Sequence, residues 1–296
     1  MAFAHTPYDG TSHPFTVGLK PIAHSEWLET DEQLIPQLTE KARLLDERYG
    51  DVFQVEPGTE DAQAEVLDLV LAYLAEHRQD LYRINEKTVQ VVNGPDVDLM
   101  TFPQLEAAAR LVQEDLVLMR SSASGYRLVG ACLCFPSSWS LSEKFGRAMP
   151  AIHESVPGFN SGRMGTVVSR LFENLKLGQL VCRYNWSIYD DEKLYHPEAR
   201  QLASNITRDH PAPLAPLFLR VERQTLRRLA GSGDILFTIR IHHDPMSLLK
   251  EHPDRAAIAT GLHRQLLALD PAQLSYKGLV SHRDMLAEAL LKTAAH

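Results

Sequence analysis

The chain has 296 residues, of which 44% are hydrophobic and 23% are charged, and its formal net charge at pH 7 is -8. This composition is typical of a folded globular protein, and the acidic balance disfavours a general nucleic-acid binder, which is normally basic. Three cysteines are too few for a secreted disulfide framework. The first residues lack the pattern of a signal peptide, and no apolar run approaches the ~20 residues of a membrane span. We therefore expect a cytoplasmic protein that binds neither nucleic acid nor membrane.

Residues 1–114 are predicted to form a helical cap. Thr59 is a candidate N-cap residue of a helix with apolar side chains at helical spacing. Shorter helices are predicted over residues 38–49 and 103–113. Acidic residues far outnumber basic ones in residues 26–80, and no catalytic pattern is visible in this part of the chain.

Residues 115–243 are predicted to form an antiparallel sheet with helices on one face. Two hairpins are indicated by glycine-containing turns at 121–125 and 230–233. A capping box from Ser140 to Glu143 opens a short helix, and a longer helix is predicted over 163–177. The expected strands are 116–120, 127–135, 180–189, 217–226 and 235–242. The order of these elements is that of a PAS-type domain, so the predicted fold class is α+β with a PAS-like core. Residues 244–296 are predicted to add helices packed on that core within one structural unit.

The sequence lacks the common motifs for phosphate binding, zinc proteases and serine hydrolases. His242 and Asp244 form an H-x-D pattern after a strand, and His282 could complete the facial triad of a non-haem iron oxygenase. His282 falls at a predicted helix start, however. A polar strand end that leads into a turn at Pro245 is therefore the favoured interpretation.

His153 lies in an apolar segment between Pro150 and Pro157. A single histidine among apolar residues is usually a hydrogen-bonded core residue. Its place before the long helix of a PAS-like order also suits a proximal haem ligand, because the faces of a porphyrin need a dry pocket. The two interpretations remain open at this point.

Charged residues alternate with apolar ones along the predicted strands. Arg183 shares a face with Asn185, and Glu222 shares a face with Gln224. Such residues commonly face solvent. Alternatively they line a cavity in which arginines pair with carboxylates of a cofactor, and Glu222 could hold an amine cation.

Five ordered motifs resemble the haem-dependent oxidative N-demethylase family. The similarity runs from about Phe15 to the last helix. The motifs are Gly18-Leu19-Lys20-Pro21 with Trp27 downstream, Cys134-Phe135-Pro136-Ser137-Ser138-Trp139, Ala151-Ile152-His153 with Val156-Pro157-Gly158, Arg183-Tyr184-Asn185-Trp186-Ser187, and Arg220-Val221-Glu222-Arg223-Gln224-Thr225-Leu226.

The resemblance implies a haem b protein that oxidises a small secondary amine such as dimethylamine with oxygen and releases formaldehyde. It also implies electrons from NADPH, delivered by a separate flavin and iron–sulfur reductase. On this basis His153 is expected to be the axial ligand of the haem iron. Arg163, Arg183 and Arg223 are expected to contact the haem propionates or the distal side. Tyr184 and Glu222 are expected to orient the amine. The predicted catalytic residues are Glu222, Tyr184 and Arg183.

Cys182 competes with His153 as a candidate ligand, because thiolate-ligated haem proteins are known oxygenases. We favour His153, because Cys182 lies on an apolar strand face and is expected to pack there.

Two other functions remain open at this stage: a haem-binding gas or redox sensor without turnover, and a non-haem iron oxygenase that uses His242 and Asp244. A visible spectrum separates the second from the haem proteins. We also expect the acidic cap, with Glu60, Asp61 and Glu65, to help recruit an electron donor.

Overall fold

A seven-stranded antiparallel sheet forms the centre of the structure, with the strand order β1–β8–β9–β10–β6–β7–β2. The structure is a computed structural model, and it describes residues 3–8, 14–207 and 212–295. The strands of this sheet are β1 (Lys20–Pro21), β2 (Phe53–Val55), β6 (Asp115–Ser122), β7 (Gly125–Cys132), β8 (Leu180–Tyr189), β9 (Phe218–Arg228) and β10 (Ile235–Pro245).

The five long strands β6 to β10 confirm the strands predicted in the middle of the chain. Both predicted hairpins are present, β6 with β7 and β9 with β10. Gly125 and Gly233, in the two turns, have positive φ angles of 95° and 75°, which glycine adopts without the strain of a Cβ atom. The α+β fold class is therefore confirmed.

The first 114 residues contain strands that the sequence pattern did not predict. β1 and β2 extend the two edges of the central sheet. A separate three-stranded sheet consists of β3 (Tyr82–Ile84), β4 (Thr88–Val91) and β5 (Val97–Asp98), and Asn93-Gly94-Pro95 lies in the connection between β4 and β5. Strands of two to four residues are too short to display a period-two pattern. The proposed division of the chain at residues 114 and 243 stays a prediction.

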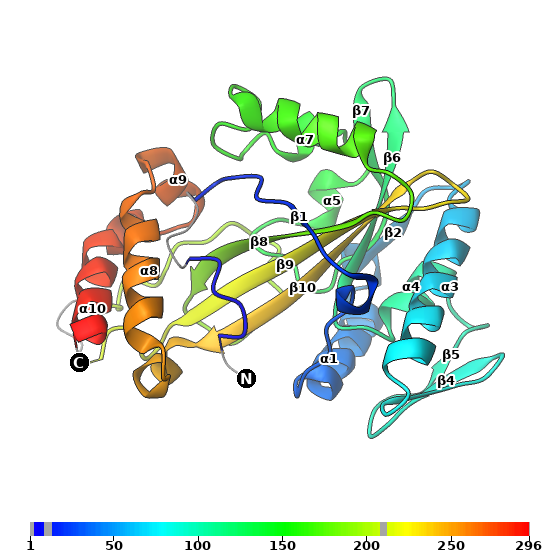
Figure 1. Ribbon diagram of the computed structural model, residues 1–296, viewed down its shortest axis with the longest axis horizontal. Coiled ribbons are helices and arrows are strands. Elements are labelled where there is room, and N and C mark those ends of the chain that lie inside the picture. The colour runs from blue at the N-terminus through cyan, green and yellow to red at the C-terminus, as the bar shows by residue number, and fades with distance from the viewer. Residues whose placement is uncertain (1–2, 9–13, 208–211, 296) are drawn as a thin grey trace.

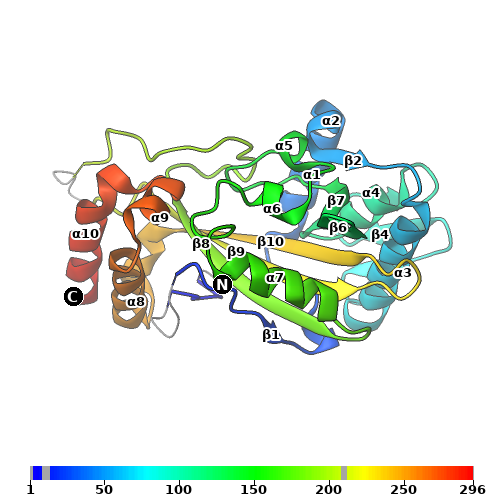
Figure 2. The ribbon, with the colours of Figure 1, turned by 90° about the horizontal axis from the view of Figure 1, so that it is seen from above.

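Helices surround the sheet in three groups (Figure 1). The helices α5 (Leu141–Lys144), α6 (Met149–Ile152) and α7 (Arg163–Asn174) lie on one face of the sheet, as Figure 2 shows from above. A second group lies near the end of the sheet that carries the β9–β10 turn, with its first helix beneath the sheet, and consists of α1 (Leu34–Glu47), α2 (Tyr49–Val52), α3 (Glu60–His77) and α4 (Gln104–Ala109). The third group lies beyond the other end of the long strands and consists of α8 (Arg255–Leu267), α9 (Pro271–Tyr276) and α10 (Arg283–Ala295). Within the described residues, no helix combines the length and the apolar character that a membrane crossing requires.

Local signals explain where several helices begin. The Ser140 side chain accepts a hydrogen bond from the Glu143 amide at 3.3 Å, which confirms the predicted capping box of α5. Thr59 does precede α3, but its hydroxyl donates to the Glu56 carbonyl at 2.6 Å and does not cap the helix. The long predicted helix begins at Arg163 as expected and ends at Asn174, a few residues early.

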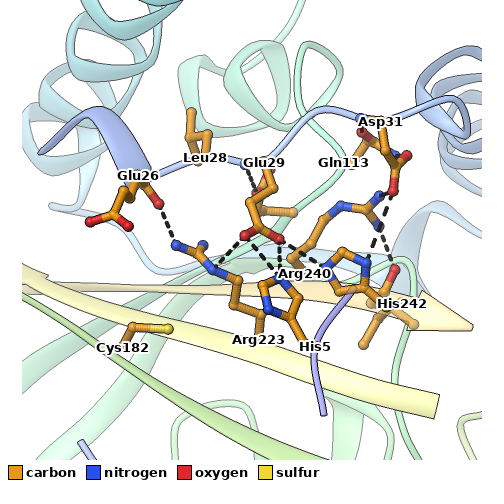
Figure 3. A network of polar contacts seen from close by, with 12 residues as sticks. His5, Glu26, Leu28, Glu29, Asp31, Gln113, Cys182, Arg223, Arg240 and His242 are labelled. Carbon is orange, nitrogen blue, oxygen red and sulfur yellow. Dashed lines mark hydrogen bonds and ion pairs between the residues drawn. The ribbon is translucent and has the colours of Figure 1, made fainter. Parts of the chain in front are cut away.

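Alternation along the three central strands divides their side chains between two faces. Register pairs Arg183 with Gln224 and Asn185 with Glu222, so these residues lie together on the face that α7 covers. Their sequence neighbours project from the opposite face, which we call the far face. There the N-terminal segment and the loop before α1 cover them (Figure 3). This arrangement confirms the predicted alternation. One set of polar side chains lies on the face that α7 covers, and a second set lies on the far face.

Candidate functional site

A cavity of about 650 Å³ lies between the sheet and the layer formed by α5, α6 and α7, with part of its wall from α9. This volume falls within the ~300–1,000 Å³ of typical ligand and cofactor pockets. Much of the wall is apolar, with side chains from both layers that include Met119, Leu128, Phe159, Val168, Phe172 and Phe237. Such a wall excludes water from a bound group and leaves its few polar side chains to orient it.

His153 lines this cavity at the end of α6. Its Nδ1 atom lies 3.0 Å from the carbonyl oxygen of Met149, and its ring stacks on Phe159 at 4.1 Å. A carbonyl oxygen can only accept, so Nδ1 carries the proton and the neutral ring has its lone pair on Nε2. Burial lowers the pKa of His153 to about 4, which keeps the ring neutral at pH 7. A neutral imidazole fixed through Nδ1 is the form that binds a metal through Nε2.

Arg183 contributes a half-buried guanidinium group to the same cavity, and its Nε atom is buried. Among the residues that the structure describes, no hydrogen-bond partner reaches its buried Nε atom. Burial lowers the pKa of Arg183, and the nearby Glu222 charge offsets only part of this effect. A buried guanidinium group without a full set of partners is costly. An anionic group in the cavity would therefore be stabilised beside Arg183.

Glu222 is the carboxylate of the cavity, and its side chain is held by two amides. Asn185 donates to one carboxylate oxygen at 3.3 Å and Gln224 donates to the other at 2.7 Å. Both donors are neutral, so they fix the orientation of Glu222 without cancelling its charge. The carboxylate is thus positioned for a cationic ligand.

Lys277 also reaches the cavity, although no motif or strand pattern predicted it. This residue follows α9 in the C-terminal part of the chain, and its ammonium group donates to the Trp186 carbonyl and to the Asn185 side chain. Burial lowers the pKa of Lys277 to about 8, although Glu222 partly opposes the change. Asn185 therefore links Lys277 to Glu222.

The remaining predicted site residues lie outside the cavity. Tyr184 and Arg223 occupy the far face, where Tyr184 packs against His5 and Arg223 Nε lies 3.0 Å from Glu29 (Figure 3). Arg163 is exposed at the first position of α7. The structure thus brings His153, Arg183 and Glu222 to one cavity and places Tyr184, Arg223 and Arg163 elsewhere.

The competing thiol, Cys182, also belongs to the far face, two residues before Tyr184 on β8. Burial raises its pKa, so the thiol is favoured over the thiolate. Both its position and its protonation disfavour Cys182 as a ligand in the cavity.

The alternative iron triad of His242, Asp244 and His282 is not assembled. Asp244 accepts a hydrogen bond from the Phe3 amide at 2.9 Å, and His282 lies 3.2 Å from the Ala203 carbonyl. His242 instead contacts Glu29 at 2.9 Å. Among the described residues, His242 converges with His5 and Glu29, and neither Asp244 nor His282 belongs to this group.

Glu65, expected to belong to an acidic surface, has a structural partner. Its carboxylate accepts from the backbone amides of Ala230, Gly231 and Ser232 in the β9–β10 turn. Glu60 and Asp61, at the start of α3, are exposed.

The family of the chain follows from a comparison with protein-family models. Residues 18–287 match the model described as haem-dependent oxidative N-demethylase, alpha subunit-like. Because the match covers most of the chain, the protein belongs to this family. The description indicates dependence on haem and, as an alpha subunit, a partner subunit.

The residues of the cavity fit a haem. His153 offers a neutral Nε2 donor, and apolar side chains form most of the wall. Arg183 supplies a cation whose buried Nε atom has no partner in the described part of the chain. Haem needs an axial donor and a dry pocket, and a cation in the pocket stabilises its anionic propionates. All three requirements are present in one cavity.

Proposed function

We propose that this protein is a haem b-dependent monooxygenase that removes a methyl group from a small secondary amine such as dimethylamine. The observation that supports this proposal most strongly is that a neutral His153 and an Arg183 whose Nε atom lacks a hydrogen-bond partner among the described residues both line one largely apolar cavity. The order of β6 to β10, with helices on one face, further favours a PAS-like haem-binding core.

In the proposed site, His153 holds the iron through Nε2, and Met149 fixes the ring through Nδ1. Arg183 pairs with a propionate, which would supply the partner that its Nε atom lacks. When bound, the haem supplies the activation of oxygen, and the protein supplies ligation, orientation and exclusion of water.

Glu222 is proposed to hold the substrate through an ion pair with the protonated amine. Asn185 and Gln224 fix its two oxygens, so the carboxylate does not need to reorganise when the amine arrives. The carboxylate therefore contributes binding and orientation of a small amine.

The overall reaction requires an external reductant. One oxygen atom of O₂ enters a methyl C–H bond and the other forms water, with two electrons and two protons consumed. The hydroxymethyl amine then breaks its C–N bond and gives formaldehyde and the demethylated amine. We propose that NADPH supplies the electrons through a separate flavin and iron–sulfur partner in the cytoplasm, a compartment that the low cysteine count favours.

A spectrum of the purified protein tests the haem assignment. We expect a Soret band in the wild-type protein, its loss or marked shift in His153→Ala, and no change in the control His263→Ala, which removes a histidine of α8. A thiolate-type ferrous–CO band that persists in His153→Ala would refute the ligand assignment.

Turnover separates the enzyme from a sensor. With dimethylamine, oxygen and a chemical reductant, the enzyme proposal expects one formaldehyde for each methyl group lost. A haem-loaded protein that binds oxygen but releases no formaldehyde with any small methylated amine would support the sensor instead.

A further inference from the structure

A second group of possible ligand side chains lies on the far face of the sheet, separate from the cavity. His5, Glu29 and His242 converge there, and their ligand atoms all lie within 4.8 Å of one another (Figure 3). Glu29 is central: its carboxylate lies 3.0 Å from His5 Nε2 and 2.9 Å from His242 Nε2. Two imidazoles and one carboxylate are a common ligand set for zinc and related divalent metals.

We propose that His5, Glu29 and His242 form a binding site for a divalent transition-metal ion of the zinc class. At metal–ligand bonds of about 2.0–2.2 Å, tetrahedral ligands lie about 3.4 Å apart. The observed separations of 2.9 and 3.0 Å need to widen by only a few tenths of an ångström to admit the ion. The fourth coordination position would belong to water, since all three side chains are partly exposed.

The surrounding residues hold these ligands in place. The Glu29 amide donates to Glu114 Oε1 at 2.9 Å, which fixes the loop that carries the carboxylate. Asp31 Oδ2 lies 4.0 Å from His242 Nδ1, and Arg240 holds Asp31 at 2.7 Å. A carboxylate beside the second nitrogen of a metal-binding histidine is a frequent outer partner that orients the ring.

Arg223 limits the affinity of the site. Its Nε atom lies 3.0 Å from Glu29 Oε1, while His242 contacts the other oxygen, Oε2. The ion would therefore share the carboxylate with a guanidinium group, and their like charges repel each other. We expect an exchangeable ion rather than a permanently bound one.

The three ligands come from parts of the chain that are far apart in sequence. His5 belongs to the N-terminal segment, Glu29 to the loop before α1, and His242 to β10. A bound ion would therefore cross-link the N-terminal segment to the sheet. This role differs from that of the haem cavity, which opens on the other face.

Zinc binding by the haem-loaded protein tests the proposal. We expect elemental analysis after equilibrium dialysis to give one zinc per chain in addition to the haem iron. Affinity should fall at least ~10-fold in His5→Gln and Glu29→Gln, because each loses one of three ligands. Arg223→Gln should bind zinc severalfold more tightly, and His263→Gln should match the wild type.

The Soret spectrum of each variant provides the folding control, since none of the substituted residues lines the cavity. The proposal is overturned if folded His5→Gln takes up as much zinc as the wild type, or if neither binds zinc. Weaker binding in Arg223→Gln would also contradict it, because removal of a neighbouring cation should favour the ion.

Discussion

Lys277→Met is expected to change the pH dependence of stability in a defined direction. In the haem-free protein, burial lowers the pKa of Lys277 to about 8, whereas an unfolded lysine titrates near 10.5. Between these values the unfolded chain binds more protons than the folded one, so the lysine's contribution to stability rises with pH. Below pH 8 both states are protonated and its cost is constant.

The size of this effect follows from the two pKa values. The interval from about 8 to 10.5, at about 1.4 kcal/mol per pKa unit, corresponds to about 3 kcal/mol. Methionine has no such titration. The stability of the wild type relative to Lys277→Met should therefore increase by about this amount from pH 8 to pH 10.5.

Denaturant unfolding at a series of pH values measures the difference between the two proteins. Other titrating groups affect both proteins alike and cancel to a first approximation. Lys176→Met is the matched control, because it removes a lysine that is exposed. A pH-independent difference for Lys277→Met as well would refute the assignment of a buried, desolvated ammonium group to the cavity.

Three further substitutions test other parts of the structure. Gly278→Ala should lower the free energy of unfolding by at least about 2 kcal/mol, because φ is 70° and a Cβ would lie 2.2 Å from the Arg200 carbonyl oxygen. Gly58→Ala is the control: its φ is also positive, but no atom lies within 4 Å of the added Cβ, so the loss of stability in the same denaturation assay should be smaller. Glu65→Ala should cost about 1–2 kcal/mol by the same measure, because three backbone amides lose their acceptor; an equal loss in the exposed Glu60→Ala would contradict this reason. Glu222→Gln should raise KM for the amine at least ~10-fold with a smaller effect on kcat, measured by formaldehyde release, and an unchanged KM would count against the proposed ion pair.

The sequence was sufficient for the long elements and insufficient for the short ones. β8 occupies the predicted residues, because ten residues of alternating character leave little ambiguity. β1, of only two residues, is defined by its pairing with β8 and carries no pattern of its own. The three-stranded sheet of β3, β4 and β5 escaped prediction for the same reason.

The motifs of the family resemblance predicted part of the candidate site. His153 and Glu222 lie in motifs that carry the family resemblance, and both reach the cavity. Arg223 is in the same motif as Glu222, yet it projects from the opposite face, because successive strand residues alternate. Lys277 carries no local signal, since only the packing of α9 brings it to Asn185.

Acidic residues of the N-terminal part form ion pairs with arginines of the central strands. The acidic N-terminal part supplies Glu29 and Asp31, which pair with Arg223 and Arg240 of the central strands at 3.0 and 2.7 Å. These two arginines therefore have internal partners and are not available for a carboxylate in the cavity.

Arg183 differs from them because its side chain faces α7 and lines the cavity. Among the described arginines of β8, β9 and β10, Arg183 is the one that lines the cavity, so it is the expected partner of an anionic group there. Arg183→Met should consequently weaken haem retention at least ~10-fold, because loss of a charge-assisted hydrogen bond to a buried anion costs more than about 1.4 kcal/mol. Competition for haem with apomyoglobin measures this loss, and Arg227→Met, which substitutes an arginine of β9 that does not line the cavity, is the control. Equal retention in the two variants would place the propionates elsewhere.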